Sequence, residues 1–430
     1  MKKLIFIQLN EINFDLLKKY SKFKNFKFFN DKFLNNIKIT KSEIEYKNLE
    51  PWIQWVSANT GLTAEEHKIF RLGDINDSNL EQIYEKIENK GYKVGAICPM
   101  NVKNNLKDSV YFIPDPWTKT LKPKKFFQNL IYKSFSEAVN ENSKNKLSLK
   151  NKIIILNLIL YFFDLKSFFK FMSYYFKSLK LKWYRAIIFD FLLHKIHTKF
   201  IKKYDVDFST VFFNAGAHIQ HHYLHNSEIL KDKLQKNPNW YINEKYDPIF
   251  DVYSFYDQIL SDYLKTNHSI LIATGLTQNP FIEKEYYYRL KDHKNFIKNL
   301  NIKFKFIYPR MSRDFLITFD NQIDCLKAAK IFEKINKINK IKLFDFEIRK
   351  NSIFVILSFN KKINKDFVMR IDDYKSLYLY NYINFVALKN GKHDQKGYIA
   401  SFGNFYNFMP SNNSHVKEIF YSIEKYFETK

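Results

Sequence analysis

The stretch VFFNAGAHIQHHYLH, residues 211–225, decides the fold that we expect for this chain. Its first residues are apolar and typical of the end of a buried strand, and Gly216 marks the turn that follows. Open α/β sheets place their ligand sites just beyond the carboxyl ends of such strands. Four histidines, at positions 218, 221, 222 and 225, would share one face of a helix. We expect a functional site here, with a half-buried histidine face that binds no ligand as the alternative.

Alternating strand-like and helical segments predict the architecture around this stretch. Strand-like runs at residues 3–9, 93–98, 207–213 and 269–273 are separated by helical segments. This alternation predicts an α/β fold with a doubly wound, mostly parallel sheet. We expect three parts: an α/β core of residues 1–117, 205–280 and 380–430, a basic, aromatic helical insertion of residues 118–204, and a small α+β cap subdomain of residues 281–379.

The composition limits the classes of function. The chain has 70 Lys and Arg against 44 Asp and Glu, and its net charge of +26 attracts anionic partners. Nucleic acid is the weaker of these partners, because no nucleic-acid-binding motif accompanies the charge. The two cysteines form no CxxC pair and predict a reducing compartment. The first apolar run is broken by Gln8 and Asn10, which favours a strand over a signal peptide, so we expect a cytoplasmic protein.

The insertion carries much of the positive charge. Residues 121–204 contain 18 Lys and Arg against 4 Asp and Glu, interleaved with Phe, Leu, Ile and Tyr. Basic and aromatic residues at helical spacing are typical of helices that lie on an anionic membrane surface or against an acidic polymer. We expect peripheral contact with the inner face of a membrane, with a helical cap whose basic face is only solvated as the alternative.

Four polar turns follow strand-like runs. They are Asn10 and Glu11, the segment from Asn214 to His218, residues 274–278, and the loop of residues 391–394. The carboxyl ends of parallel neighbouring strands lie at one edge of a sheet, where these turns would converge. Imidazoles and oxygen donors that converge there suit a divalent metal ion that organises a phosphate-like group.

The order of these motifs resembles the alkaline phosphatase superfamily, in particular its type I phosphodiesterase/nucleotide pyrophosphatase branch. The family's motifs correspond here to Asn10-Glu11, to Thr60-Gly61-Leu62 followed by His67, to Asn214-Ala215-Gly216-Ala217-His218, to Ala273-Thr274-Gly275, and to Gly391-Lys392-His393. The resemblance covers residues 1–117 and 205–430 but not the basic insertion. It implies an alkaline phosphatase-like fold that handles phosphate or sulfate groups.

The departures from the family imply an altered site. The family binds two metal ions, typically zinc, through Asp and His, and attacks with Thr or Ser. His218 and His393 match its ligands, but Asn10 and Asn214 stand where it has aspartates. The nucleophile position falls near Glu50, which has no hydroxyl. The resemblance therefore implies a degenerate metal site rather than the two-metal mechanism.

From these motifs we assign roles to the candidate residues. We expect one divalent metal ion at most, with zinc the first choice, or none. The metal ligands would be His218, His222, His393 and Asp394, whereas His221 and His225 are local additions. The catalytic residues would be Glu50, Ser57 and Thr60, and the substrate-binding residues Asn10, Glu11, Asn59, Asn214, Thr274 and Gln278.

The expected function is that of a phosphodiesterase- or phosphatase-like hydrolase, or of a phosphoryl-type group transferase. Its substrate would be anionic, such as a lipid-linked or surface-glycan precursor. The alternative is a catalytically degenerate binding protein that uses the same cleft for an anionic glycan or partner.

Overall fold

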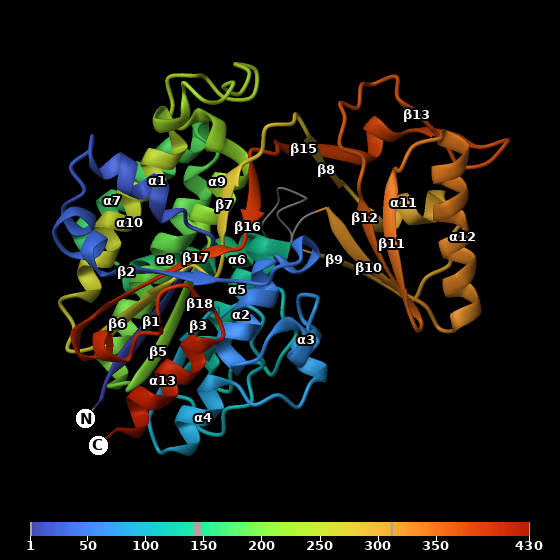
Figure 1. The fold of residues 1–430 in the computed structure, drawn as a ribbon. Helices are drawn as coiled ribbons and strands as arrows, with labels where there is room; N and C mark the ends of the chain where they lie inside the picture. Colours follow the sequence, from blue (N-terminus) through green and yellow to red (C-terminus); the bar gives the residue numbers. More distant parts are fainter. Residues whose placement is uncertain (1, 141–147, 311–312, 430) are drawn as a thin grey trace. The chain divides into compact units, whose positions relative to one another are not determined.

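The computed structural model describes residues 2–140, 148–310 and 313–429, which divide into two compact units (Figure 1). The first unit comprises Met1–Phe135, Lys152–Ile282 and Asn390–Lys430. The second comprises Ser136–Asn151 and Glu283–Lys389. Most of the second unit is therefore a single insertion between two segments of the first.

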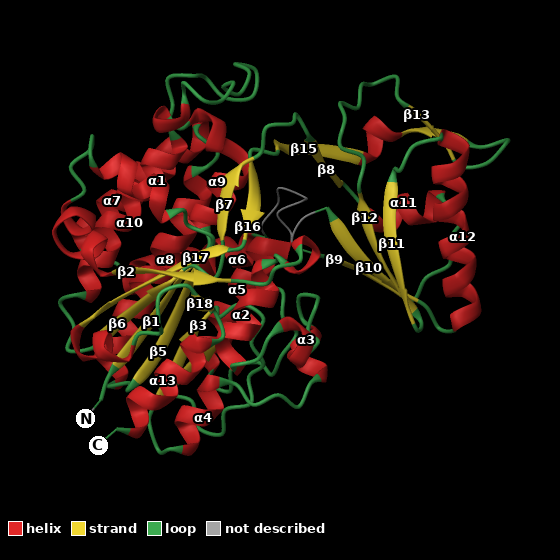
Figure 2. Ribbon diagram, viewed as in Figure 1, coloured by secondary structure: helices red, strands yellow, loops and turns green. Residues whose placement is uncertain are grey.

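A mostly parallel sheet forms the centre of the first unit (Figure 2). Its strand order is β18-β2-β17-β6-β1-β5-β3-β4. Strand β1 pairs in parallel with β5 and β6, and β3 pairs in parallel with β4 and β5, whereas β17 runs antiparallel to β2 and β6. The strands are β1 (Leu4–Leu9), β2 (Ile37–Lys41), β3 (Val94–Ile97), β4 (Tyr111–Ile113), β5 (Phe208–Phe213), β6 (Ser269–Ala273), β17 (Lys396–Phe402) and β18 (Ser414–His415). The predicted α/β fold with a doubly wound, mostly parallel sheet is confirmed.

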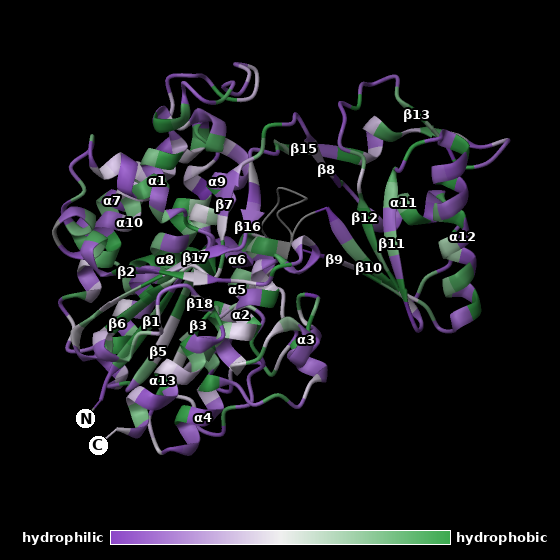
Figure 3. Ribbon diagram, viewed as in Figure 1, coloured by the Kyte–Doolittle hydropathy of each residue, from purple (hydrophilic) through white to green (hydrophobic). Residues whose placement is uncertain are grey.

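Helices cover both faces of this sheet, because the central strands are apolar on both sides (Figure 3). In β1, Ile5 and Ile7 belong to the larger core, whereas Leu4 and Phe6 belong to the core on the other face. A strand buried on both faces is a nearly continuous apolar run, as β1 is. The larger core contains residues of α1 (Phe14–Ser21), α8 (Tyr184–Tyr204), α9 (Ala215–Tyr223) and α10 (Pro248–Tyr263), and the other core those of α2 (Pro51–Thr60), α4 (Ile83–Asn89) and α13 (Glu418–Glu428).

The basic stretch of the sequence is helical. It forms α5 (Phe126–Asn140), α6 (Leu149–Phe162), α7 (Leu165–Lys180) and the start of the long α8, which continues to Tyr204. Buried residues of α8, such as Ile187 and Ile196, join the larger core of the first unit. In the described part of the chain, no helix is both long enough and apolar enough to cross a membrane.

The second unit is an α+β structure with a core of its own. Its largest sheet is antiparallel, in the order β11-β12-β10-β9, and its core includes Phe315, Phe332 and Ile353. The elements are β8 (Tyr286–Leu290), α11 (His293–Asn299), β9 (Phe306–Pro309), β10 (Asp314–Thr318), α12 (Gln322–Asn339), β11 (Phe344–Arg349), β12 (Ser352–Leu357), β13 (Val368–Arg370), β14 (Ser376–Tyr378) and β15 (Ile383–Leu388).

A short antiparallel ribbon completes the first unit near α9. It pairs β7 (Thr277–Pro280) with β16 (Gly391–Asp394), so the residues expected as a loop at 391–394 form a strand instead. In this register His393 lies opposite Gln278 and Asp394 lies opposite Thr277. The ribbon lies beside α9 (Figure 1). It thereby brings two of the predicted polar turns to the carboxyl end of β1.

Candidate metal site

The turn after β1 places a carboxylate at the edge of the sheet. Glu11 is buried and has a φ of 60°, in the left-handed region that residues other than glycine seldom adopt. Its backbone N–H donates to the Thr274 carbonyl at 3.0 Å, and its carbonyl accepts from Gln220 Nε2 at 2.7 Å. The end of β6 and helix α9 therefore hold this strained residue. Such strain is concentrated at functional sites, where the surrounding structure sustains it.

Glu11 meets two histidines from distant parts of the chain. Its Oε2 atom lies 3.0 Å from His221 Nε2, on α9, and 3.1 Å from His393 Nε2, on β16. The two Nε2 atoms are 3.2 Å apart. Among the described residues, these three form a group of potential metal ligands.

This arrangement fits a divalent metal ion. Around a tetrahedral ion with bonds of about 2.0–2.2 Å, ligand atoms are about 3.3–3.6 Å apart, only slightly farther than the three contacts here. Two imidazoles and one carboxylate are also a frequent ligand set of catalytic zinc, in which the fourth position stays open to substrate or water. The site could thus hold one metal ion through Glu11, His221 and His393.

The electrostatics of the group show how strongly its members interact. Burial alone would raise the pKa of the Glu11 carboxyl, but His393 and His221 outweigh burial and hold that pKa well below its usual range. Burial lowers the pKa of His393, but the opposing charges of Glu11 and Glu50 raise it to about 9. When no metal ion is bound, the positive charge that attracts these three groups to one another must therefore come from a bound proton.

A second layer of residues orients the three ligands. Gln278 donates from Nε2 to Glu11 Oε2 at 2.5 Å, and Asn10 donates from Nδ2 to Glu11 Oε1 at 2.9 Å. On the other side of the His393 ring, Nδ1 lies 3.6 Å from Glu50 Oε2. A carboxylate at that position favours the tautomer in which Nε2 is free to bind a metal, as at many zinc sites. Glu50 precedes the first turn of α2.

Two glycines permit the close approach of the elements that carry the histidines. A Cβ atom at Gly391 would lie 2.1 Å from Gln278 Oε1 and 3.1 Å from the Gln220 carbonyl oxygen. A Cβ atom at Gly216, in the first turn of α9, would lie 1.9 Å from a side-chain carbon of Ile12. A larger residue at either position would displace the side chain of Gln278 or Ile12 beside the turn after β1.

Sequence reasoning missed the residue that holds the start of α9. Asp190, buried on α8, accepts from the backbone N–H groups of Asn214 at 3.2 Å and Ala215 at 2.8 Å, and from the Tyr256 hydroxyl at 2.8 Å. Burial raises the pKa of Asp190 to about 7, against these hydrogen bonds, which lower it. Asp190 thus caps the helix that presents His221. Its distance in sequence from residue 214 gave no signal of this contact.

The predicted metal ligands are not all brought together. His393 joins the group around Glu11, and His221, expected as a local addition, joins it as well. The rings of His218 and His222 instead pair with each other, with centroids 4.4 Å apart. Asp394 accepts from Asn279 Nδ2 at 2.7 Å and from the Lys396 N–H at 2.9 Å. A metal role for His218, His222 and Asp394 stays a prediction.

The hydroxyl groups of the predicted nucleophiles Ser57 and Thr60 form hydrogen bonds with other groups of the protein. Ser57 is buried on α2, with its Oγ 3.2 Å from His67 Nε2. His67 Nδ1 accepts the Ile69 N–H at 2.9 Å, so a neutral His67 carries its proton on Nε2 and donates it to Ser57. Burial lowers the pKa of His67 to about 4, so the ring is neutral at pH 7. Thr60 donates its hydroxyl to the Val56 carbonyl at 2.8 Å.

The predicted substrate-binding residues lie in different surroundings. Asn10, Glu11, Gln278 and Asn214 are connected, since Asn10 Nδ2 also donates to Asn214 Oδ1 at 2.8 Å. Thr274 is buried and accepts the Tyr398 N–H at 2.9 Å, which joins β6 to β17. Asn59 is buried on α2, and its amide has no hydrogen-bond partner in the described structure. Their substrate roles stay predictions; the connected set contacts the Glu11 carboxylate through Asn10 and Gln278, whereas Thr274 contacts Glu11 through its backbone carbonyl.

Comparisons with known proteins find similarity in structure but not in sequence. No family model matches the chain, and no curated protein matches it. Phosphonoacetate hydrolase from Sinorhizobium meliloti matches with a TM-score of 0.44 and 9% identity over 98% of this chain and 95% of that one. Alkaline phosphatase from the Antarctic bacterium TAB5 matches with a TM-score of 0.41 and 10% identity over 99% and 98%. Murine ectonucleotide pyrophosphatase/phosphodiesterase 5 matches with a TM-score of 0.39 and 12% identity over 98% and 93%.

These solved structures all belong to the alkaline phosphatase superfamily, the family that the order of the sequence motifs resembles. The match is structural and distant.

Proposed function

We propose that this protein is a metal-dependent hydrolase of phosphoryl-type substrates and that Glu11, His221 and His393 hold its metal ion. One observation carries the proposal: a carboxylate and two imidazoles converge within 3.0–3.2 Å at the carboxyl end of a central strand. Ligands of open α/β sheets bind at this edge. The phosphoryl class comes from the sequence resemblance and from the net charge of +26, which favours anionic substrates.

The residues of the site have different roles in this proposal. A divalent metal ion held there would act as a Lewis acid toward a phosphoryl oxygen. Glu11 supplies the anionic ligand, and Gln278 and Asn10 fix both of its oxygens. Glu50 contacts His393 on the side away from Glu11, so we assign it to positioning this ring rather than to contact with the substrate.

We propose direct attack by water rather than a covalent intermediate on the protein. The support lies in the hydroxyl groups of α2: Ser57 accepts a hydrogen bond from His67 and Thr60 donates to its own helix. A serine nucleophile needs an adjacent base that takes its proton, whereas the His67 Nε2–H group faces Ser57 as a hydrogen-bond donor. Group transfer to a second substrate would use the same site with another acceptor in place of water.

The proposal also includes the type of substrate and the location that we expect from the sequence. A lipid-linked or surface-glycan precursor would supply the anionic group and would suit a cytoplasmic protein at the inner face of a membrane. The net positive charge and the basic helices α5 to α8 support this choice of substrate.

Metal analysis and phosphoesterase assays of the purified protein test the proposal. We expect about one equivalent of a divalent metal ion and hydrolysis of p-nitrophenyl phosphate or bis(p-nitrophenyl) phosphate that a chelator abolishes. His221→Ala and His393→Ala should lose both metal and activity. His218→Ala tests the ligand set expected from the sequence. Loss of metal in His218→Ala but not in His221→Ala, or full activity in chelator, would overturn the proposed site.

A second candidate function is supported by the same hydroxyl contacts. If the chain has lost hydrolysis, the site would bind an anionic glycan or protein partner without turning it over. The engagement of Ser57 and Thr60 by other protein groups favours this alternative. A metal-loaded protein that binds phosphate but hydrolyses neither phosphomonoesters nor phosphodiesters would select it.

A further inference from the structure

Helix α7 exposes a stripe of large apolar side chains. Leu165, Phe169, Phe176 and Leu179 are between 61% and 72% exposed. Their spacing of four, seven and three residues keeps them within an arc of about 80° on a helix with 3.6 residues per turn. A contiguous apolar surface of this kind on a protein is typical of an interaction site.

The opposite face of α7 packs against the protein core. On this face Phe171 and Tyr174 pack against the larger core of the first unit and Ser178 is buried, while Phe168, at the edge of the stripe, packs against the same core. The Tyr174 ring contacts Phe191 and Phe255, with centroid distances of 5.8 and 6.2 Å. The exposed stripe is therefore a second apolar face on a helix that is already anchored.

Lysines lie along one side of the stripe. Lys166, Lys170, Lys177 and Lys180 are displaced from it by about 60–140° around the helix axis. Lys170 lies over the rings of Tyr174 and Phe191, at 5.7 Å from each centroid. An apolar stripe flanked by lysines is the pattern of a helix that lies in the interface of a bilayer with anionic lipids.

A groove of about 670 Å³ adjoins this basic side and is lined by residues of α7, α8 and α10. Five of its lining residues are lysines, at positions 166, 170, 195, 202 and 265, against the two carboxylates of Asp164 and Asp262. The lining thus has an excess of 5 − 2 = 3 positive charges. A groove with this excess is suited to a phosphate-bearing headgroup.

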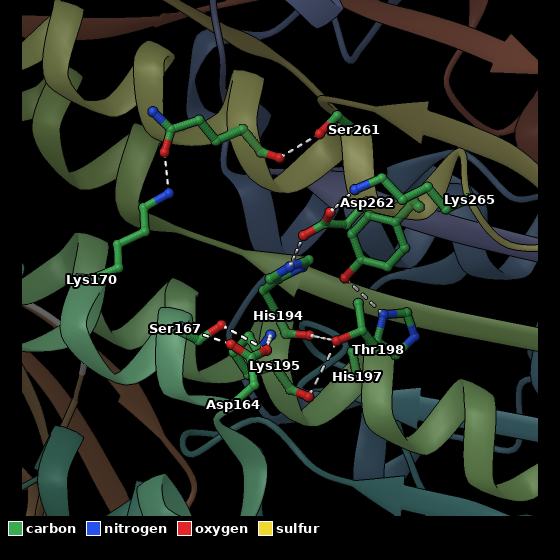
Figure 4. A network of polar contacts seen from close by, with 12 residues as sticks. Asp164, Ser167, Lys170, His194, Lys195, His197, Thr198, Ser261, Asp262 and Lys265 are labelled. Carbon is green, nitrogen blue, oxygen red and sulfur yellow. Dashed lines mark hydrogen bonds and ion pairs between the residues drawn. The ribbon is translucent and has the colours of Figure 1, made fainter.

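Both carboxylates that line the groove are in contact with other side chains of the protein (Figure 4). Asp164 pairs with Lys195 at 3.2 Å. Asp262 contacts Lys265 at 2.7 Å and His194 Nε2 at 3.2 Å. Neither Lys166 nor Lys202 forms an ion pair within the residues that the structure describes, so their charges are available to an anion.

The preceding helix adds a second apolar row. On α6, Ile153, Leu156 and Leu160 are between 53% and 60% exposed and recur at spacings of three and four residues. Leu158 and Phe162, on the opposite face of this helix, are buried in the larger core. Only two residues separate α6 from α7. Both members of this helical pair therefore carry an outward apolar face.

We propose that α7 and the lysine-lined groove beside it form a docking surface for an anionic lipid bilayer. The apolar stripe enters the boundary between headgroups and acyl chains, and the groove receives the phosphate of an anionic headgroup. Charge complementarity selects this partner over a neutral membrane, because lysines flank the apolar stripe on one side and line the groove. The surface is independent of the candidate metal site and does not rest on its function.

Vesicle co-sedimentation of the purified protein tests this surface. We expect the protein to bind phosphatidylcholine vesicles that contain phosphatidylglycerol and not vesicles of phosphatidylcholine alone, with weaker binding as salt is raised. Phe169→Ser with Phe176→Ser should weaken binding about tenfold or more. Lys166→Glu with Lys202→Glu should weaken it by at least about 25-fold, because the loss of each positive charge alone is worth about fivefold.

Matched variants on α12 serve as controls, because that helix also exposes apolar and basic residues. Ile323 is 66% exposed and Lys330 is exposed, so Ile323→Ser with Lys330→Glu should leave vesicle binding unchanged. Because all the substituted side chains are at the surface, the thermal unfolding temperature and metal content should stay those of the wild type.

Several outcomes would overturn the proposal. These are equal binding to neutral and anionic vesicles, no binding to either, or the same loss in the α12 controls as in the α7 variants. Binding to heparin without binding to vesicles would assign the surface to an acidic polymer. A wild-type dimer that Phe169→Ser with Phe176→Ser converts to a monomer would assign it to a second copy of the chain.

Discussion

Substitution of Glu50 by Gln tests whether the carboxylate behind His393 matters for metal binding. In the structure, Glu50 Oε2 lies 3.6 Å from His393 Nδ1, an ion-pair distance that is too long for a good hydrogen bond. A full charge at this distance is worth about 1 kcal/mol in water and about 4–5 kcal/mol at an effective dielectric constant of 20. The Glu50 side chain is 33% exposed, so solvent screening moves the value toward the lower end.

We therefore expect Glu50→Gln to weaken metal binding about tenfold, equivalent to about 1.4 kcal/mol, with the three ligands intact. Competition with a chromophoric chelator measures this affinity, and Glu45→Gln, on an exposed side chain paired with Lys47, is a matched control. If Glu50 acts through the His393 ring, Glu50→Gln should also lower the pKa of His393 in the metal-free protein, which NMR titration of the ring measures. An unchanged metal affinity, or an unchanged His393 pKa, would refute the positioning role.

Three further predictions concern the same region. Gly391→Ala should lower metal affinity and destabilise the fold by about 1–3 kcal/mol, because its Cβ would lie 2.1 Å from Gln278 Oε1; wild-type affinity by chelator competition would contradict this. Ser57→Ala should cost about 1 kcal/mol in urea unfolding yet keep most of the activity, and a loss above about a hundredfold in kcat would instead mark Ser57 as the nucleophile. In metal-free protein, the folded-state pKa of about 9 for His393 exceeds its unfolded value, so its stabilisation is complete below about pH 6.5 and is lost as the pH rises through 9. Urea unfolding between pH 6 and 10 should show this decline, and His393→Ala should remove it.

The fold was predictable because it depends on local patterns that tertiary contacts reinforce. Strands β1 and β5 are nearly continuous apolar runs, and each is followed by a polar turn and a helix. A strand buried on both faces leaves few alternatives to a covered, mostly parallel sheet. The strand at residues 391–394 was not predictable in this way. It exists because it pairs with β7, which lies more than a hundred residues earlier in the chain.

The site was only partly predictable, for geometric reasons. In the structure α9 ends at Tyr223, so His225 lies in the 3₁₀ turn Leu224–Asn226 that follows. A helical pattern places the histidines at 218, 221, 222 and 225 on one face, but it does not say which edge of that face points to the turn after β1. In the structure this edge carries His221. The left-handed backbone of Glu11, which aims its carboxylate at both rings, is likewise set by contacts with Thr274 and Gln220 rather than by local sequence.

The hydrogen bonds of Asn10 show why one carboxylate ligand is sufficient at this site. Trp55 Nε1 can only donate, and it lies 2.8 Å from Asn10 Oδ1, so this contact fixes the orientation of the amide. Asn10 Nδ2 must then face Glu11 Oε1 at 2.9 Å and Asn214 Oδ1 at 2.8 Å, and it donates to both. An aspartate at position 10 would instead place a second negative charge against Glu11, which would require a second cation to offset it.

Amides in place of carboxylates at positions 10 and 214 therefore suit a site that binds a single metal ion. With Glu11 as the one charged ligand and two neutral imidazoles, a dication leaves the group with a net charge of +1. A second metal ion beside Asn10 and Asn214 would meet neutral amides, which supply no charge to hold it. The residual positive charge is the reason to expect an anionic substrate. It also predicts that phosphate should inhibit the metal-bound protein competitively and should bind the metal-free protein much more weakly.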